Sequence, residues 1–281
     1  MLQFLLWAAL LTGLAVFAIP YIFMISNSFE IFSYSLPYPP RLFPTSFNLD
    51  AYEYIITKKH ILRPFFNSAF ITMVTTFISV AFSALSAYGF ARIKFYGREP
   101  LFKIYLFTLM LPGFLSIIPQ FLTLQKIVLP GFPNGLTGTR TGLILLYVST
   151  GICGSTFFLK GFFEGVPKDI EESVIIDGGS HWDIFLRIML PISRPALGTM
   201  TIFMLQGIWE EFFTAKVILG AKGEKFLTLP IVIQRLNGEH ATRWEWVFAA
   251  SILMQISVIL LFIIFQKKFV IGGLTEGAIK S

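Results

Sequence analysis

Six long stretches of the chain are almost free of charged residues, and shorter polar segments separate them. A helix needs about 20 mostly apolar residues to cross the hydrocarbon core of a bilayer. A transmembrane β-barrel would instead show short segments of alternating polarity. The pattern therefore predicts an all-α integral membrane protein with six transmembrane helices, over residues 1–28, 64–91, 103–125, 141–159, 195–217 and 246–266.

A cleaved signal peptide is the alternative for the first stretch. Signal peptides have a basic start, a short apolar core and a cleavage site of small residues. Residues 1–28 contain no basic residue, their apolar run is long, and Pro20-Tyr21 is a poor context for cleavage. We therefore expect a retained membrane helix.

Composition supports a membrane protein. Hydrophobic residues make up 55% of the 281 residues, charged residues only 14%, and the mean hydropathy is +0.72, whereas soluble domains carry about 25% charged residues. Cys153 is the only cysteine, which excludes a disulfide scaffold. The net charge of +6 could suggest nucleic acid, but no Lys/Arg run exceeds two residues. Basic residues in membrane proteins commonly lie at lipid headgroups, so we expect no nucleic-acid partner.

Charge does not decide the orientation of the chain. Six spans place both termini on one side, and the connecting segments of each side carry the same number of Lys and Arg residues. The positive-inside rule therefore gives no answer. The first connection, residues 29–63, is Pro-rich and continues into Asn48–Tyr52, which predicts a helix start.

Residues 160–194 are polar and predict two short helices that do not span the membrane. Pro167 suits a first helical turn, and the acids that follow it favour a helix N-terminus. Gly178-Gly179 predicts the end of this first helix, because glycine tolerates the left-handed conformation. The acids are Asp169, Glu171 and Glu172.

Ser180 and Asp183 predict a capping box at the start of the second helix. Its apolar residues recur at helical spacing and would form one face, before Pro191 and Pro195 end the helix. Two interpretations stay open from these residues: an amphipathic element on the lipid headgroups, or a docking surface for another protein. The apolar residues are Trp182, Phe185, Leu186 and Met189.

The spacing of Glu172, Gly178, Ile188, Leu190 and Pro191 resembles the EAA loop of permease subunits in binding-protein-dependent ABC importers. The resemblance covers nearly the whole chain and is greatest to the carbohydrate-uptake branch, the maltose-permease-G-like subunits. The further matching motifs are Asn67-Ser68, Ala87–Arg92, Phe95-x-Gly97-Arg98, Leu111-Pro112, Ile118-Pro119, Trp209-x-Glu211-Phe212-Phe213 and the tail from Gly273 to Lys280.

The chain departs from the family pattern at a few positions. Ser173 and Val174 stand where the family usually has two alanines, and Glu210 replaces a residue that is commonly Asn. The N-terminus also lacks the usual basic tail.

The resemblance implies a type I ABC importer permease fold with a cytoplasmic coupling helix within 160–194. It places both termini, including the tail 267–281, in the cytoplasm and the 29–63 segment outside. The expected location is a bacterial or archaeal cytoplasmic membrane.

The resemblance also implies that the loop couples the permease to a dimer of ATPase subunits, which bind ATP and Mg. Glu172 would meet a basic or polar group there and Gly178 would supply the turn; the alternative for Glu172 is a solvated acid at a helix N-terminus. The chain itself lacks the phosphate-binding loop G-x-x-x-x-G-K-[ST], so we expect no cofactor in it. The expected coupling residues are Glu171, Glu172, Ser173, Asp177, Gly178, Ile188, Leu190 and Pro191.

A stripe of hydroxyl residues follows one face of the second span. Such a stripe favours close helix packing, but it could also line the translocation path or a permease interface. In the fifth span, two interpretations are open for Trp209, Glu210 and Glu211. These residues could serve structure or gating, with pairing to Lys216 as one structural possibility, or they could contact the substrate. The stripe contains Ser68, Thr72, Thr75, Thr76, Ser79, Ser83 and Ser86.

The expected partners are a second permease in a heterodimer, the ATPase dimer, membrane lipid, a sugar, and an extracytoplasmic binding protein docking on 29–63, 125–140 and 220–245. A glycerol phosphate ester is the alternative solute, although no span carries the basic groups it would need. A stand-alone secondary transporter is less favoured, because no inverted repeat is visible. We expect no metal site, catalytic set or enzyme activity, since His60, His181 and His240 are far apart.

Overall fold

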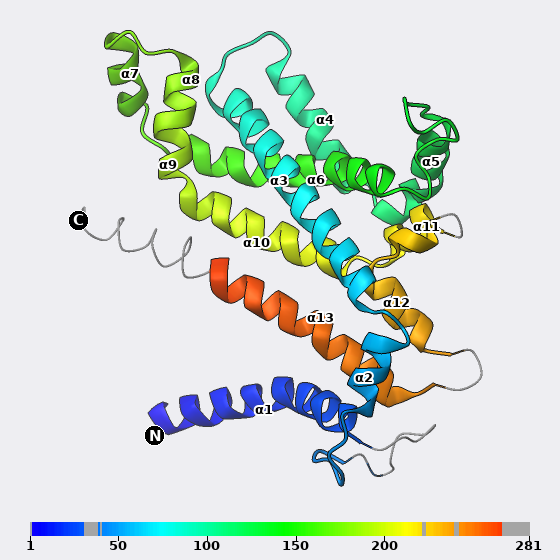
Figure 1. Ribbon diagram of the computed structural model, residues 1–281. Coiled ribbons are helices and arrows are strands. Elements are labelled where there is room, and N and C mark those ends of the chain that lie inside the picture. The colour runs from blue at the N-terminus through cyan, green and yellow to red at the C-terminus, as the bar shows by residue number, and fades with distance from the viewer. Residues whose placement is uncertain (1, 31–38, 40, 221–222, 239–241, 266–281) are drawn as a thin grey trace. The chain divides into compact units, whose positions relative to one another are not determined.

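The computed structural model describes residues 2–30, 39, 41–220, 223–238 and 242–265 (Figure 1). Within these ranges the regular structure is helical, apart from one isolated bridge between Leu129 and Phe132. The predicted tail 267–281 lies outside the described residues.

Four continuous helices are long and apolar enough to cross a membrane. Each of these four helices corresponds to an apolar stretch that predicted a span. The number of candidate spans rises to six if each of two bent helix pairs counts as one span. The four are α1 (Leu2–Ser28), α3 (Leu62–Arg92), α6 (Arg140–Glu164) and α13 (Trp244–Phe265).

The predicted span 103–125 is divided in the structure. It forms α4 (Arg98–Met110) and α5 (Gly113–Lys126), which are bent by 106° relative to each other. The break lies at Leu111-Pro112, where Leu111 is extended with φ −79° and ψ 122°. Proline has no backbone N–H and disfavours helical geometry in the residue before it, so a helix ends here in spite of continuous hydrophobicity.

The second bent pair contains the fifth span. A helical segment made of α8 (His181–Asp183), the π-helical η1 (Ile184–Met189) and α9 (Leu190–Ile192) meets α10 (Arg194–Glu210) at 73°. The predicted 195–217 span is interrupted after Glu210, and α11 (Phe213–Leu219) follows. The remaining helices are α2 (Asp50–Thr57), α7 (Asp169–Ile176), the 3₁₀ turn η2 (Glu224–Phe226) and α12 (Leu229–Leu236).

The chain forms two compact units. The first comprises Met1–Asn67 and Thr228–Ser257. In it, the ring of Tyr54 in α2 stacks on Trp246 of α13 with centroids 4.0 Å apart, and Phe23 of α1 meets Phe248 edge-on. The predicted helix start near Asn48–Tyr52 is confirmed, because α2 begins at Asp50.

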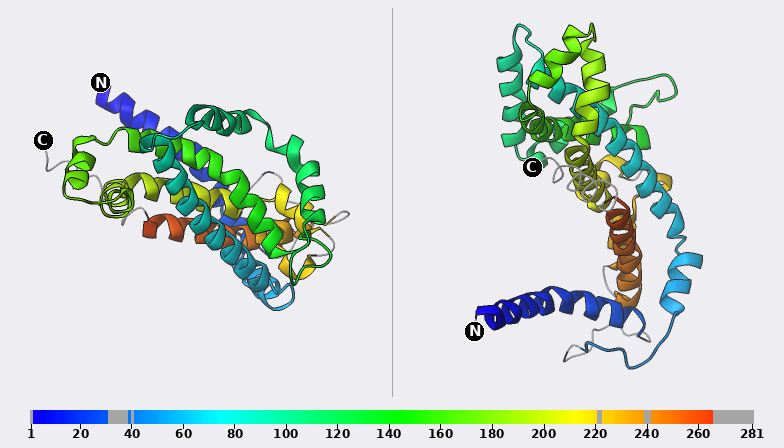
Figure 2. Two further views of the ribbon diagram at one scale, coloured as in Figure 1. Left: turned by 90° about the horizontal axis from the view of Figure 1, so that it is seen from above. Right: turned by 90° about the vertical axis from the view of Figure 1, so that its left-hand side faces the viewer.

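The second unit comprises Ser68–Leu227 and Val258–Ser281. In it, α6 packs against α4 and α10. The C-terminal ends of α3 and α6 lie at the same end of this unit as α7–α9 and the start of α10 (Figures 1 and 2). A buried cluster joins these elements; it contains Ala84, Ala87, Tyr88, Leu159, Phe163, Val166, Ile184, Phe185, Met189 and Ala196.

Candidate functional site

The α7–α9 element, residues 169–192, begins with a short helix that ends in a glycine turn. Gly178 adopts φ +82°, and its N–H donates to the carbonyl of Ile175 at 3.0 Å. The Gly179 N–H donates to the carbonyl of Val174 at 2.8 Å. These two bonds form a Schellman motif, which satisfies carbonyls at the helix end. The helix thus ends where the two glycines predict.

A capping box starts the second helix, as predicted. The Ser180 hydroxyl accepts from the Asp183 N–H, and the Asp183 carboxylate accepts from the Ser180 N–H at 3.0 Å and from its hydroxyl at 2.6 Å. Because these bonds stabilise the ionised form, chiefly the one from the hydroxyl, they lower the pKa of Asp183 below its usual value. The turn between α7 and α8 is therefore closed at both ends by specific hydrogen bonds.

The predicted apolar face of this second helix is divided. Phe185 and Met189 are buried, together with Ile184, whereas Trp182 and Leu186 are 62% and 54% exposed. The reason is that residues 184–189 form a π-helix, whose wider turn changes which side chains share a face. Trp182 still meets the buried Phe185 edge-on, with ring centroids 6.0 Å apart.

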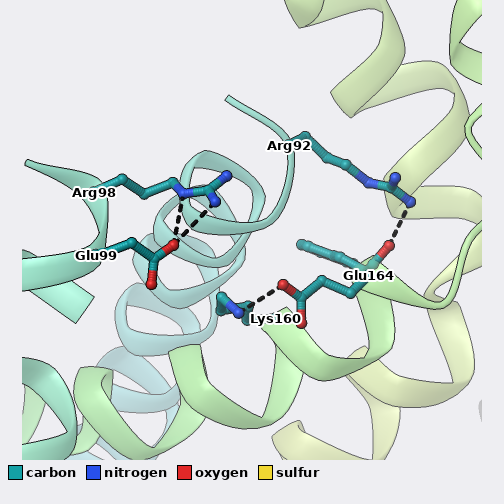
Figure 3. A network of polar contacts seen from close by, with 6 residues as sticks. Arg92, Arg98, Glu99, Lys160 and Glu164 are labelled. Atoms are coloured by element: carbon teal, nitrogen blue, oxygen red, sulfur yellow. Dashed lines mark hydrogen bonds and ion pairs between the residues drawn. The ribbon is translucent and has the colours of Figure 1, made fainter. Parts of the chain in front are cut away.

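Arg92, the last residue of α3, ties this element to two membrane helices. Its Nε lies 2.9 Å from Oε1 of Glu171 in α7, and the two side chains are only 3% and 12% exposed. Its Nη2 donates to the carbonyl of Phe163, at 2.6 Å, in the last turn of α6, and to that of Val166 just after the helix. Figure 3 shows the Arg92 side chain beside this end of α6. The N–H of Nε is not aligned with the carboxylate, so the contact with Glu171 is an ion pair rather than a good hydrogen bond.

Tyr88 makes a second link from α3, one turn earlier. Its hydroxyl lies 3.3 Å from Nδ1 of His181, and its ring contacts Phe185 with centroids 5.2 Å apart. The last turn of α3 therefore contacts both short helices of the element.

Two further ion pairs lie close by (Figure 3). Lys160 and Glu164 of α6 pair at 2.6 Å, and the Lys160 ammonium also lies 4.5 Å from the ring centroid of Phe102 in α4. Arg98 and Glu99, at the start of α4, pair at 3.0 Å and are more exposed.

The structure separates the predicted coupling residues into two groups. Glu171 faces inward to Arg92. Ile188, Leu190 and Pro191 are half-buried. The exposed members are Glu172, Ser173, Asp177 and Gly178.

Large apolar side chains are exposed beside these polar ones. Ile176 is 85% exposed and Ile175 is 53% exposed, near Trp182 and Leu186 in the sequence. We call these four residues, with Glu172 and Asp177, the α7–α8 tip. The tip is apolar with two carboxylates, and its base is fixed in the core.

Most of the hydroxyl stripe of α3 is buried, including Thr76, whereas Ser86 is half-buried. Its members Ser68, Thr72, Thr75, Ser79 and Ser83 are each at most 3% exposed. Ser83 donates to the carbonyl of Ile152 in α6 at 3.3 Å. The stripe thus has a packing partner inside the chain, and its role in a path or a permease interface stays a prediction.

Glu211 occupies the break between α10 and α11. Its carboxylate accepts from the Tyr147 hydroxyl of α6 and from the N–H groups of Thr214, at 2.7 Å, and Ala215, at 3.0 Å. It therefore caps α11. The Lys216 ammonium lies over the Phe212 ring instead, 5.2 Å from the centroid, so the predicted pair with Lys216 is not formed.

Trp209 and Glu210 differ in environment although they are neighbours. Trp209 is 3% exposed and borders a small apolar pocket between α10 and the end of α13. Glu210 is exposed at the end of α10. Substrate contact by either residue stays a prediction.

The sequence interpretation quoted Tyr88 and Arg92 as parts of a motif but assigned them no role. The sequence did contain a signal that Arg92 is special, since it is the first charged residue after a long charge-free stretch. Its partners lie far along the chain and could not be identified from spacing. Among the described residues no group of three or more His, Cys, Asp or Glu side chains could hold a metal ion; His240 lies outside them.

Residues 79–270 match the family model described as "Binding-protein-dependent transport system inner membrane component". The chain is 28% identical to the diacetylchitobiose uptake system permease protein NgcG of Streptomyces coelicolor, over 97% of this chain and 87% of that protein. It is 30% identical to the polygalacturonan/rhamnogalacturonan transport system permease protein YtcP of Bacillus subtilis, over 98% and 97%. Its fold resembles a chain of a bacterial ABC transporter involved in the import of the acidic polysaccharide alginate, with a TM-score of 0.78, 22% identity, and coverage of 95% and 96%.

Proposed function

Because this chain belongs to the family of binding-protein-dependent transport system inner membrane components, we propose that it forms a sugar path with a second permease and is driven by ATPase subunits docked at the α7–α8 tip. Its relatives are permease subunits of carbohydrate-uptake ABC importers, and the chain is a permease of that branch. The finer assignments below are ours.

The observation that carries the docking proposal is the contrast between the tip and the base of the α7–α9 element. Ile176 is 85% exposed at the tip, whereas Ile184 and Met189 at the base are fully buried. Apolar side chains grouped on a surface with charged neighbours are typical of protein interfaces. A partner groove with an apolar floor and basic rim would complement Ile175, Ile176 and the carboxylates of Glu172 and Asp177.

This docking site supports a mechanical role. The chain carries no phosphate-binding loop, so the energy of ATP hydrolysis would come from the partner subunits. A rigid element can transmit their movement to the spans, while a flexible loop would absorb it. The Schellman turn and the capping box supply that rigidity within the element.

The solute we propose is a neutral sugar or oligosaccharide. In the second unit, two cationic side chains near the ends of the spans are engaged: Arg92 by Glu171 and two carbonyls, and Lys160 by Glu164. Glu210 is exposed on α10, and a carboxylate on the path would repel an anionic solute. The glycerol phosphate ester is therefore less favoured.

The chain would also have both termini in the cytoplasm, with the α7–α8 tip on that side. The binding protein would then meet the opposite side, where residues 29–63, 125–140 and 220–245 connect the spans. This orientation follows from placing the tip against cytoplasmic ATPase subunits.

Ile176→Asp tests the docking site. We expect the ATPase dimer to bind the purified permease pair about 10-fold more weakly or worse, because a charge would enter an apolar contact. The dissociation constant is measured on permeases in lipid nanodiscs, and stimulated ATP hydrolysis is measured with liganded binding protein.

Tyr96→Asp is the matched control. Tyr96 is fully exposed in the connection between α3 and α4, at the same end of the unit. It should leave ATPase binding within about twofold, as surface substitutions away from an interface usually do. Normal binding of the Ile176→Asp variant would show that the tip does not dock the ATPase.

A further inference from the structure

Arg92 joins three elements through one guanidinium group. It ends α3, binds two carbonyls at the end of α6, and pairs with Glu171 in α7. The side chain is 3% exposed, so these groups rather than water satisfy its charge. Such a junction is specific to the tertiary structure, since Arg92 is about 70 residues or more from its partners in the chain.

The chemistry of the junction suits arginine. Carbonyls at the C-terminal end of a helix carry partial negative charge, so a cation there is stabilising. The Phe163 carbonyl lies in the last turn of α6, where it also accepts from the Val166 N–H at 3.2 Å, and the Val166 carbonyl lies just after the helix. A guanidinium can contact two carbonyls and a carboxylate at once through its planar set of donors, whereas an ammonium acts as a single point charge. Glu171 supplies the compensating full charge for a buried cation.

Connectivity shows what the junction adds. α7 is linked by short segments of the chain to α6 on one side and, through α8 and α9, to α10 on the other. A displacement of α7 therefore reaches α6 and α10 through the backbone. No short segment links it to α3. The Arg92–Glu171 ion pair joins α3 to α7 directly, beside the apolar packing of Val174, whereas Tyr88 joins α3 to His181 in α8.

We propose that the Arg92–Glu171 pair transmits movement of a docked α7 to α3, which makes Arg92 and Glu171 positioning residues for transport. This inference rests on the proposed docking of the ATPase at the α7–α8 tip. It assigns Glu171 a different role from its neighbour Glu172, which is exposed at the tip.

Glu171→Ala is the decisive variant. It removes the ion pair between α7 and α3 but leaves the Arg92 guanidinium bound to the carbonyls of Phe163 and Val166, so the junction with α6 is retained. The apolar packing of Val174 on the buried cluster is also unchanged. Glu99→Ala is the matched control, because it removes a more exposed ion pair, with Arg98, at the same end of the unit.

The measurement uses the complete importer in proteoliposomes with liganded binding protein. Uptake of sugar per ATP hydrolysed is determined, with the dissociation constant of the ATPase dimer measured separately. We expect Glu171→Ala to lower uptake per ATP about 10-fold while ATPase binding stays within about twofold. Glu99→Ala should change neither quantity, and Arg92→Lys should restore only part of the wild-type ratio.

Two results would overturn the proposal. If Glu171→Ala keeps the wild-type uptake per ATP, and Arg92→Lys lowers only the yield or thermal stability of the complex, the pair is merely structural. If Glu171→Ala weakens ATPase binding as strongly as Ile176→Asp does, Glu171 acts at the interface. Failure of the docking proposal can be distinguished from failure of the Arg92–Glu171 proposal. If the docking proposal fails, the Ile176→Asp variant itself binds the ATPase normally.

Discussion

At the scale of single residues, the turn of the α7–α9 element is defined by close contacts. A Cβ atom built on Gly179 would lie 2.5 Å from Cγ1 of Val174 and 3.0 Å from its carbonyl oxygen. Val174 is also one of the positions where the chain departs from the two alanines usual in the family it resembles. The larger Val174 therefore occupies space that requires glycine at position 179.

Gly179→Ala should destabilise the protein by about 1–3 kcal/mol through overpacking. Adding Val174→Ala removes the closest contact and should recover about half of the loss, so the two substitutions are not additive. The thermal midpoint of the permease complex in detergent reports both effects.

Gly161→Ala is the control for the change of glycine to alanine. A Cβ there meets no atom within 4 Å, and the residue lies in α6, where alanine is the better helix former. An additive result for the Gly179 and Val174 pair would contradict the proposed contact.

At the scale of elements, the ends of the helices depend on local chemistry more than on hydrophobicity. Pro112 ends α4 within a continuous apolar stretch, and Glu211 ends the long α10 and caps α11. An ionisable residue within a membrane segment is expensive unless it is bound. Glu211 meets that requirement through Tyr147 and two backbone amides.

Glu211→Ala should lower the free energy of unfolding by about 2–4 kcal/mol, because it removes a helix cap and leaves the Tyr147 hydroxyl without its acceptor. Tyr147→Phe should cost less, since the cap remains. Both are measured as shifts in the thermal midpoint.

Glu210→Ala is the matched control for stability, because Glu210 is exposed. It should shift the midpoint little. Equal losses for Glu210→Ala and Glu211→Ala would show that the cap is not the source of the effect.

At the scale of the whole molecule, the distribution of polarity is that of a protein in lipid. Phe4 and Phe17 of α1 are 75% and 77% exposed, while Thr75, Ser79 and Ser83 of α3 are fully buried. Exposed phenylalanine side chains are compatible with the hydrocarbon of a bilayer, whereas polar side chains in membrane proteins face the protein interior. The orientation is a separate matter, because the Lys and Arg residues are balanced between the two sides.

Cysteine labelling tests the orientation in a Cys153→Ser background. Phe43→Cys should react with a membrane-impermeant thiol reagent in intact cells. Tyr96→Cys and Ile176→Cys should react only after permeabilisation. All three positions are exposed in this chain, at 77%, 105% and 85%. Tyr96 lies outside the proposed docking site and stays accessible when the ATPase is bound, whereas Ile176→Cys is labelled in cells that lack the ATPase subunit.

Labelling of Tyr96→Cys and Ile176→Cys in intact cells, without labelling of Phe43→Cys, would reverse the proposed orientation. The ATPase docking site would then lie on the wrong side of the membrane.

The sequence alone was sufficient for the membrane class, four continuous helices long and apolar enough to span, the helix start near Asp50, the glycine turn and the Ser180–Asp183 capping box. These features depend on the hydrophobicity of a long stretch or on residues a few positions apart, and such interactions are readable from spacing. The family resemblance from the motif around Glu172 and Gly178 was likewise confirmed by the family match.

The tertiary structure alone decided the contacts between distant residues. It turned Glu171 inward to Arg92, paired Tyr147 with Glu211, and placed Ser83 of the hydroxyl stripe against α6. It also placed a π-helix at 184–189, which exposed Trp182 and Leu186. The physical reason is that burial and charge pairing depend on which helices meet, and a periodic pattern along one helix does not specify its neighbour.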